Sequence, residues 1–160
     1  MAMFHNANMV TKHFYVTLPS NTPINGDQNK SAKYKVVQPN VIELAVQNWE
    51  VGIVEVFIPN KFADGVTAES VGLIYIYLDI ISEQRVGNVL AKLARIIDVA
   101  DSGDYHIFHY EFNKVHYHPL SIGRIDSIGV VLTTSTGELV RFADDAQVSV
   151  VLEFRPKRGF

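Results

Sequence analysis

The sequence predicts an all-β protein built as an antiparallel sandwich or barrel. Short apolar segments rich in β-branched and aromatic residues recur along its 160 residues. Clusters of Gly, Pro, Asn and Asp separate these segments about every ten to fifteen residues, as turns do. Near the C-terminus, Val148, Val150, Leu152 and Phe154 alternate with mostly polar neighbours. This period of two is typical of a strand with one buried face.

The C-terminal stretch predicts a hairpin followed by a long strand. Ile125–Thr133 is rich in β-branched residues and predicts the first strand. Ser135-Thr136-Gly137 predicts a turn, because Gly137 adopts positive φ at little cost. Glu138–Phe142 predicts a short returning strand, and Ala143-Asp144-Asp145 ends it. The alternating segment around Val148–Arg155 is then the final strand.

The N-terminal half contributes further strands, which we expect at Lys12–Leu18, Lys33–Val37, Val41–Val46 and Trp49–Ile58. Gln38-Pro39-Asn40 separates the second from the third, because proline cannot donate a ladder hydrogen bond. Trp49–Ile58 is nearly continuously apolar rather than alternating. Such a strand is covered on both faces or lies at an interface.

The middle of the chain holds two clear strands and one ambiguous segment. Val71–Ile81 and Tyr105–Val115 alternate well, and both carry aromatic residues. Val86–Val99 has apolar residues at helical spacing, which favours one short helix on local signal alone. The same residues also alternate, and an all-β context would override a weak helical preference. The choice between helix and strand therefore stays open for this segment.

Composition restricts the possible functions. Apolar residues make up 48% of the chain and charged residues 19%, which is typical of a globular domain with a core. The net charge of −3 gives no general attraction to nucleic acid or anionic membranes. There is no cysteine, so disulfides and thiolate metal sites are excluded. The apolar runs are shorter than the ~18–20 residues of a membrane span, and residues 1–14 lack the pattern of a signal peptide.

We divide the chain into three parts. Residues 1–10 are expected to form a flexible N-terminal arm, because termini are commonly loose. Residues 11–156 would form the single β domain. Residues 157–160 would be a short basic tail, too weakly charged to predict nucleic-acid binding.

Four of the six histidines, His106, His109, His116 and His118, lie within thirteen residues. His-x-His on a strand is found in the metal site of cupins, where imidazoles and a carboxylate bind a divalent ion. No carboxylate follows His118 before Asp126. We therefore expect no bound metal and no other cofactor at these residues.

The sequence gives no positive support for an enzyme. A Gly-x-Ser-x-Gly run, a phosphate-binding loop and a dinucleotide fingerprint are all missing. Glu50 and Glu55 are five residues apart on one strand, so they would face opposite sides and cannot act as a catalytic pair. We expect no catalytic residues.

Four phrases in order resemble one family of proteins: HFYVTLPSN, WEVGIVEVFIP, IYIYLDIISEQRVGN and DSIGVVLTTSTGELVRF with VSVVLEFRP. The chain is similar from Phe14 to Arg155 to the penton-type single jelly-roll minor capsid proteins of Polinton (Maverick) elements and adintovirus-like viruses. Each phrase alone is weakly specific, whereas all four in this order are fairly specific. About eight strands in two antiparallel four-stranded sheets, which a jelly roll needs, fit the strand pattern.

The resemblance implies a structural protein of an icosahedral virion, made in the host cell. Five copies would form a homopentamer at each five-fold vertex, surrounded by double jelly-roll major capsid proteins and other minor capsid proteins. It implies no small-molecule ligand. The alternative class is a ligand-binding sandwich of lectin-like or cupin-like type, which would be a monomer or dimer.

Two sets of apolar residues are predicted to have separate roles. The core anchors are Trp49, Tyr75, Val150, Leu152 and Phe154. The apolar surplus of three strands predicts contacts between subunits. These interface candidates are Trp49, Val51, Ile53, Phe57, Tyr75, Tyr77, Tyr105, Phe108, Tyr110 and Phe112.

Overall fold

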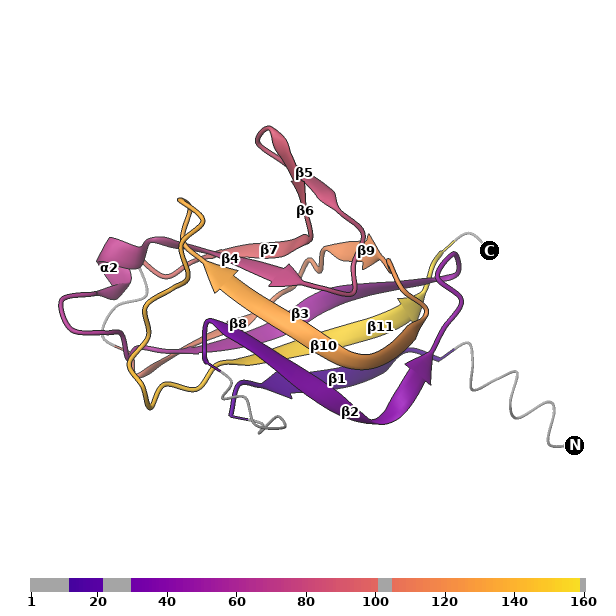
Figure 1. The fold of residues 1–160 in the computed structure, drawn as a ribbon, viewed down its shortest axis with the longest axis horizontal. Helices are drawn as coiled ribbons and strands as arrows, with labels where there is room; N and C mark the ends of the chain where they lie inside the picture. The colour runs from indigo at the N-terminus through magenta and orange to yellow at the C-terminus, as the bar shows by residue number, and fades with distance from the viewer. Residues whose placement is uncertain (1–11, 22–29, 101–104, 159–160) are drawn as a thin grey trace, which may run out of the picture.

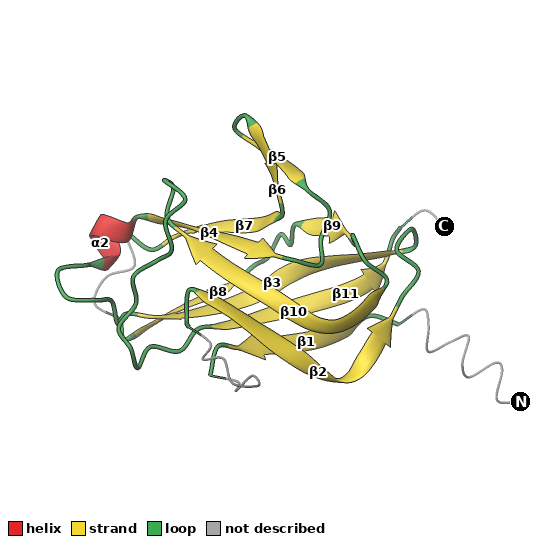
Figure 2. Ribbon diagram, in the orientation of Figure 1, coloured by secondary structure: helices red, strands yellow, loops and turns green. Residues whose placement is uncertain are grey.

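Two antiparallel β-sheets pack face to face, as Figures 1 and 2 show. The computed structural model describes residues 12–21, 30–100 and 105–158. The arm expected at residues 1–10, the turn expected at residues 101–104 and the end of the basic tail lie outside these described residues. The all-β prediction is confirmed.

The first sheet has the order β1-β11-β3-β8, and β9 pairs with the far end of β3. Its strands are β1 (Phe14–Pro19), β3 (Trp49–Pro59), β8 (Ile107–Glu111), β9 (Tyr117–Pro119) and β11 (Ser149–Pro156). β8 pairs with residues 55–59 of β3, and β9 with residues 50–52. The expected fourth strand of this sheet is therefore split in two, which makes the sheet five-stranded.

The second sheet has the order β2-β10-β4-β7. Its strands are β2 (Lys33–Glu43), β4 (Leu73–Leu78), β7 (Leu93–Asp98) and β10 (Arg124–Thr133). Apart from the separate β5–β6 pair, successive strands lie in alternate sheets, except that β7 follows β4 in the same sheet and β9 follows β8. This is the double Greek key of a single jelly roll, which confirms the predicted fold.

Strand β2 joins two segments that the sequence separates. Its ladder with β10 pairs Val37 with Ser127 and then Ile42 with Ile125, so residues 38–41 have no partner on β10. The prediction of two strands was wrong about their number, because the chain stays extended through Pro39. It was right about the interruption, because residues 38–41, which include Pro39, lie opposite Asp126 alone and bulge out of the ladder.

The segment 86–99 is β structure, so the short helix that local signal favours is absent there. β5 (Gln84–Val86) and β6 (Val89–Ala91) form a hairpin, and β7 follows it directly. Gly87 adopts φ 58° in the two-residue turn. Figure 1 shows the hairpin standing away from the sandwich at its upper side. Its strands pair only with each other in the described structure.

Two other segments differ from the prediction in their type of secondary structure. The short α2 (Ala68–Val71) precedes β4, where the sequence predicts a loop and the start of a strand. Thr67 caps it by accepting a hydrogen bond from the Ser70 amide. Glu138–Phe142 is not a strand, because it makes only isolated bridges from Leu139 and Phe142.

In the described residues no helix is long and apolar enough to cross a membrane.

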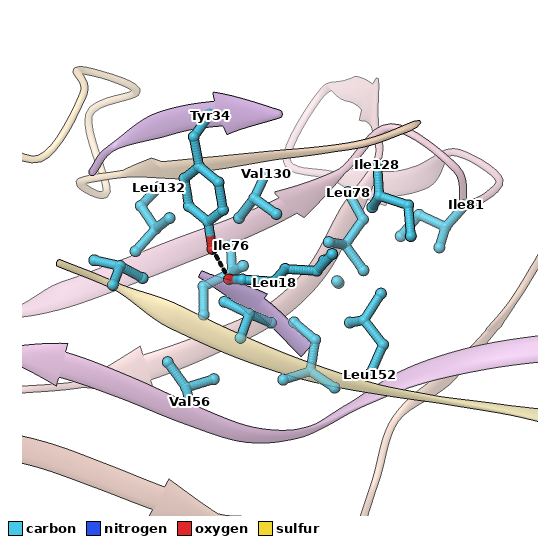
Figure 3. Packing of buried hydrophobic residues seen from close by; sticks show 14 of the residues in the cluster. Leu18, Tyr34, Val56, Ile76, Leu78, Ile81, Ile128, Val130, Leu132 and Leu152 are labelled. Carbon is cyan, nitrogen blue, oxygen red and sulfur yellow. Dashed lines mark hydrogen bonds between the residues drawn. The ribbon is translucent and has the colours of Figure 1, made fainter. Parts of the chain in front are cut away.

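Apolar side chains fill the space between the sheets (Figure 3). The inward residues of β11 lie opposite those of β1, with Phe14 paired to Phe154 and Val16 to Leu152. Among the expected anchors, Trp49, Val150, Leu152 and Phe154 are buried, whereas Tyr75 is only half-buried because it points away from the core.

Tyr34 brings a hydroxyl group into this core. Its hydroxyl donates to the Leu18 carbonyl oxygen at 2.7 Å, which ties β2 of one sheet to β1 of the other (Figure 3). Burial raises the pKa of the Tyr34 phenol well above its usual range, so the phenol stays a neutral donor.

Candidate assembly surface

Four predicted interface residues lie inside the protomer. Trp49, Val51, Ile53 and Phe108 are at most 7% exposed and belong to the core. Their side chains cannot meet a second subunit while the sandwich stays packed, so we remove them from the candidate surface. The long apolar run of β3 therefore reflects burial between the sheets rather than an unused apolar face.

Two further candidates close one side of the sandwich. The Tyr110 hydroxyl donates to the Asp98 carbonyl oxygen at 2.7 Å. The Arg95 guanidinium lies 3.8 Å from the centre of the Phe112 ring, and Arg95 also donates to the Lys114 carbonyl oxygen. These contacts join β7 of one sheet to β8 and the loop after it in the other. Both aromatic residues are half-buried there.

Phe57 lies on the outer face of the five-stranded sheet. Its ring stacks on the His109 imidazole, with centres 4.3 Å apart, and His109 is hydrogen-bonded to Glu55 at 2.8 Å. Glu111 is the cross-strand partner of Glu55. The two carboxylates therefore face each other across the strand pair, and the His109 ring contacts one of them. His109 and Glu111 are exposed and Phe57 and Glu55 are half-buried, so the cluster forms a polar aromatic patch at the surface.

Tyr75 and Tyr77 lie on the outer face of the four-stranded sheet. They are half-buried, and the neighbouring residues on that face, Ile96 and Val131, are also apolar. Tyr105 precedes β8 and is 71% exposed, the highest value among the large apolar residues described. These side chains remain accessible to a partner.

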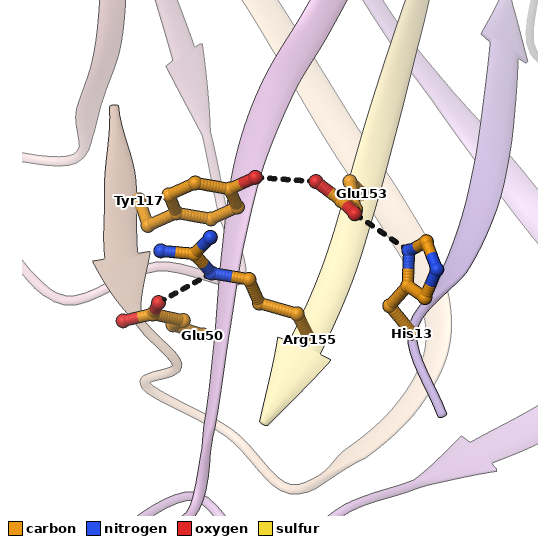
Figure 4. Close-up of polar contacts among 5 residues, drawn as sticks. All are labelled: His13, Glu50, Tyr117, Glu153 and Arg155. Atoms are coloured by element: carbon orange, nitrogen blue, oxygen red, sulfur yellow. Dashed lines mark hydrogen bonds and ion pairs between the residues drawn. The ribbon is translucent and has the colours of Figure 1, made fainter. Parts of the chain in front are cut away.

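A chain of polar contacts runs across β9, β3 and β11 to His13, the residue before β1, at the other end of the five-stranded sheet (Figure 4). Arg155 Nε donates to Glu50 at 2.7 Å, and the guanidinium lies 3.3 Å from the centre of the Tyr117 ring. The Tyr117 hydroxyl donates to Glu153, which also pairs with His13 Nδ1 at 2.7 Å. Burial and the bond to Glu153 raise the pKa of Tyr117 to about 12.

Gly52 allows a chain segment to cross this face of β3. A Cβ atom at position 52 would lie 2.6 Å from Val115 Cγ1 and 2.7 Å from the His116 carbonyl oxygen. Only glycine therefore fits beneath residues 115–117, which place Tyr117 over the sheet. In the sequence, the signal for this close approach is a lone glycine inside an apolar strand.

Among the four clustered histidines, His116 and His118 lie close enough for their charges to interact, whereas His109 has a partner of its own. His109 pairs with Glu55, and His118 is hydrogen-bonded to the Ala94 carbonyl oxygen at 2.9 Å. Desolvation and the charges of Arg95, His118 and Lys114 lower the pKa of His116. Over the described part of the chain, no three His, Asp or Glu side chains converge in a geometry for a metal ion.

Exposed apolar side chains gather on two opposite sides of the sandwich. One side is formed by the edge strands β1 and β2 and carries Tyr15, Val37 and Val41. The opposite side is formed by the hairpin, β7 and β8. Its exposed apolar residues are Val89, Leu90, Ile96, Tyr105 and Ile107. Figure 2 shows β1 and β2 along the lower side and the hairpin at the upper side.

Comparison with known proteins supports the fold. No protein-family model matches the sequence, and no match is found among curated proteins. The crystal structure of the selenomethionine-labelled mavirus penton protein matches with a TM-score of 0.64. The match covers 91% of this chain and 100% of that one, at 7% sequence identity. At this identity, the likeness shows a shared jelly-roll fold.

Proposed function

We propose that this chain is the penton subunit of an icosahedral capsid, present as a homopentamer at the five-fold vertices of a virion. The observation that carries the proposal is the structural match to a penton protein over that protein's whole length. The sequence phrases that resemble Polinton penton proteins support the same role independently, because they do not depend on the coordinates.

The features of the surface are consistent with a structural role. A closed ring uses a heterologous contact, in which one surface of each subunit meets a different surface of the next. The two apolar sides described above lie on opposite sides of the sandwich, so one side of a copy can meet the other side of its neighbour. We expect double jelly-roll major capsid proteins and other minor capsid proteins to surround the ring, with residues 1–10 and the basic tail available for contacts with them.

The test is native mass spectrometry together with sedimentation velocity of the purified full chain. A pentamer supports the penton assignment. A chain that remains monomeric at high concentration, or a closed dimer with two-fold symmetry, would remove it and leave only the jelly-roll fold. A monomer or dimer that retains one metal ion per chain in elemental analysis would favour the ligand-binding alternative.

A further inference from the structure

Among the elements that the structure describes, the β5–β6 hairpin contributes least to the packing of the core. Val89 and Leu90 are 57% and 59% exposed, and neither belongs to the core. A two-stranded hairpin alone is only marginally stable in water, and this one has no further strand beside it. Exposed apolar residues on a projecting element are typical of an interaction site.

The opposite side of the sandwich offers a matching surface. The bulge at residues 38–41 of β2 interrupts the ladder with β10, and Val37 and Val41 on either side of Pro39 are exposed. Asp126 of β10 faces this interruption in the register, between the two paired segments. We define these residues, 37–43 together with 124–126, as the β2 bulge surface.

The charges of the two surfaces are opposite. Residues 82–92 of the hairpin segment carry Arg85, Lys92 and Glu83, so their formal charge is +2 − 1 = +1. The β2 bulge surface carries Glu43, Arg124 and Asp126, so its formal charge is +1 − 2 = −1. Within the described residues, the five ion pairs include neither Arg85 nor Asp126.

We infer that the hairpin of one copy docks on the β2 bulge surface of the next copy through the face that carries Leu90 and its cross-strand partner Arg85, with Leu90 against Val37 and Val41. Arg85 then approaches Asp126 of its neighbour. The partner is a second copy of this chain, because the two surfaces differ, carry opposite charge and lie on opposite sides of one subunit, which propagates contacts around a ring. This inference rests on the proposed function and specifies the junction it needs.

The absence of cysteine makes a direct test possible, since any introduced pair is the only source of disulfides. Leu90→Cys and Val41→Cys in one chain should give covalent species up to the pentamer on a non-reducing gel after mild oxidation. Either substitution alone provides the control, because one cysteine per chain can link no more than two copies. The two positions are on opposite sides of one subunit, so a bond within a chain is not expected.

A charge exchange gives the second readout. Arg85→Glu and Asp126→Arg should each raise the concentration needed for half-assembly by about fivefold or more, and the double variant should recover much of the loss. Asp64→Arg, at an exposed loop position, is the matched control and should leave assembly unchanged.

The outcomes separate the two proposals. If the unmodified chain forms pentamers but the cysteine pair gives no ladder and the charge variants assemble normally, the hairpin junction is wrong and the penton role stands. If the unmodified chain is only monomeric, both are overturned. A ladder together with recovery in the double variant supports the junction.

Discussion

The Arg155 guanidinium lies over the Tyr117 ring while its Nε donates to Glu50, so one side chain of β11 holds β9 in place across β3. Arg155 and Glu50 are 24% and 18% exposed, which limits screening of the pair by water. β9 has only three residues and, among the strands that the structure describes, pairs with β3 alone. This contact is therefore a principal support for the segment that crosses Gly52.

We expect Arg155→Ala to lower the free energy of unfolding by about 1–3 kcal/mol, because it removes the cation–π contact and leaves Glu50 partly buried without its partner. Urea denaturation of the purified protein measures this loss. Arg158→Ala provides the control at an exposed position and should change stability by less than about 0.5 kcal/mol. Equal effects at the two positions would contradict the structural role of Arg155.

Phe154→Ala should cost roughly 3–5 kcal/mol, because Phe154 is fully buried and stacks on Phe14 with ring centres 4.9 Å apart. The substitution opens a cavity between β11 and β1. Tyr105→Ala removes a larger but exposed aromatic side chain and should cost less than about 0.5 kcal/mol. A loss below about 1 kcal/mol for Phe154→Ala would place this face of β11 outside the core.

Gly52→Ala should destabilise the fold by about 1–3 kcal/mol, since its Cβ would overlap a backbone carbonyl that cannot move without shifting the crossing segment. Gly129→Ala is the matched comparison. There the new Cβ meets the Asp79 carboxylate at 2.8 Å, and a side chain can rotate away. Thermal unfolding should rank Gly52→Ala as the less stable variant, and the reverse order would refute the rigid crossing.

The His116 imidazole should titrate below its ordinary pKa of about 6.5, because desolvation and then the charge of Arg95 disfavour the protonated ring. A histidine with a lowered pKa in the folded state binds protons more readily when unfolded. Its contribution to stability is therefore present above pH of about 6.5 and is lost as the pH falls toward the folded pKa.

An NMR titration of the His116 ring measures this pKa directly. Arg95→Gln should raise the midpoint of the His116 titration. Lys61 instead pairs with Asp145, so Lys61→Gln should leave that midpoint unchanged. A midpoint at or above the ordinary value in the unmodified chain would show that the crossing segment does not desolvate His116.

The strands with a strict period of two were predictable, since alternation depends only on one buried face. Val150, Leu152 and Phe154 are buried as the pattern indicates. The hairpin at residues 84–91 was missed because its apolar residues also fit a helical stripe. The Gly87-Asn88 pair between two short apolar runs is a hairpin signal that could have identified it.

The candidate surface was less predictable than the fold. Trp49, Val51 and Ile53 read as interface residues because a continuous apolar run does not reveal which face the core uses. The coverage of β3 depends on residues 115–117, more than sixty positions away in sequence. Local pattern cannot detect such a crossing, nor can it place Val37 and Val89 on opposite sides of the sandwich.

The bulge at Pro39 has a consequence for how the chain behaves at high concentration. An uninterrupted edge strand offers a backbone template on which further chains can polymerise without limit. In β2 the extended run carries a proline, which has no amide hydrogen to donate, and the register breaks beside it. Fibre growth by strand addition at this edge is therefore opposed, and association there must depend on side chains, which favours finite and reversible assembly.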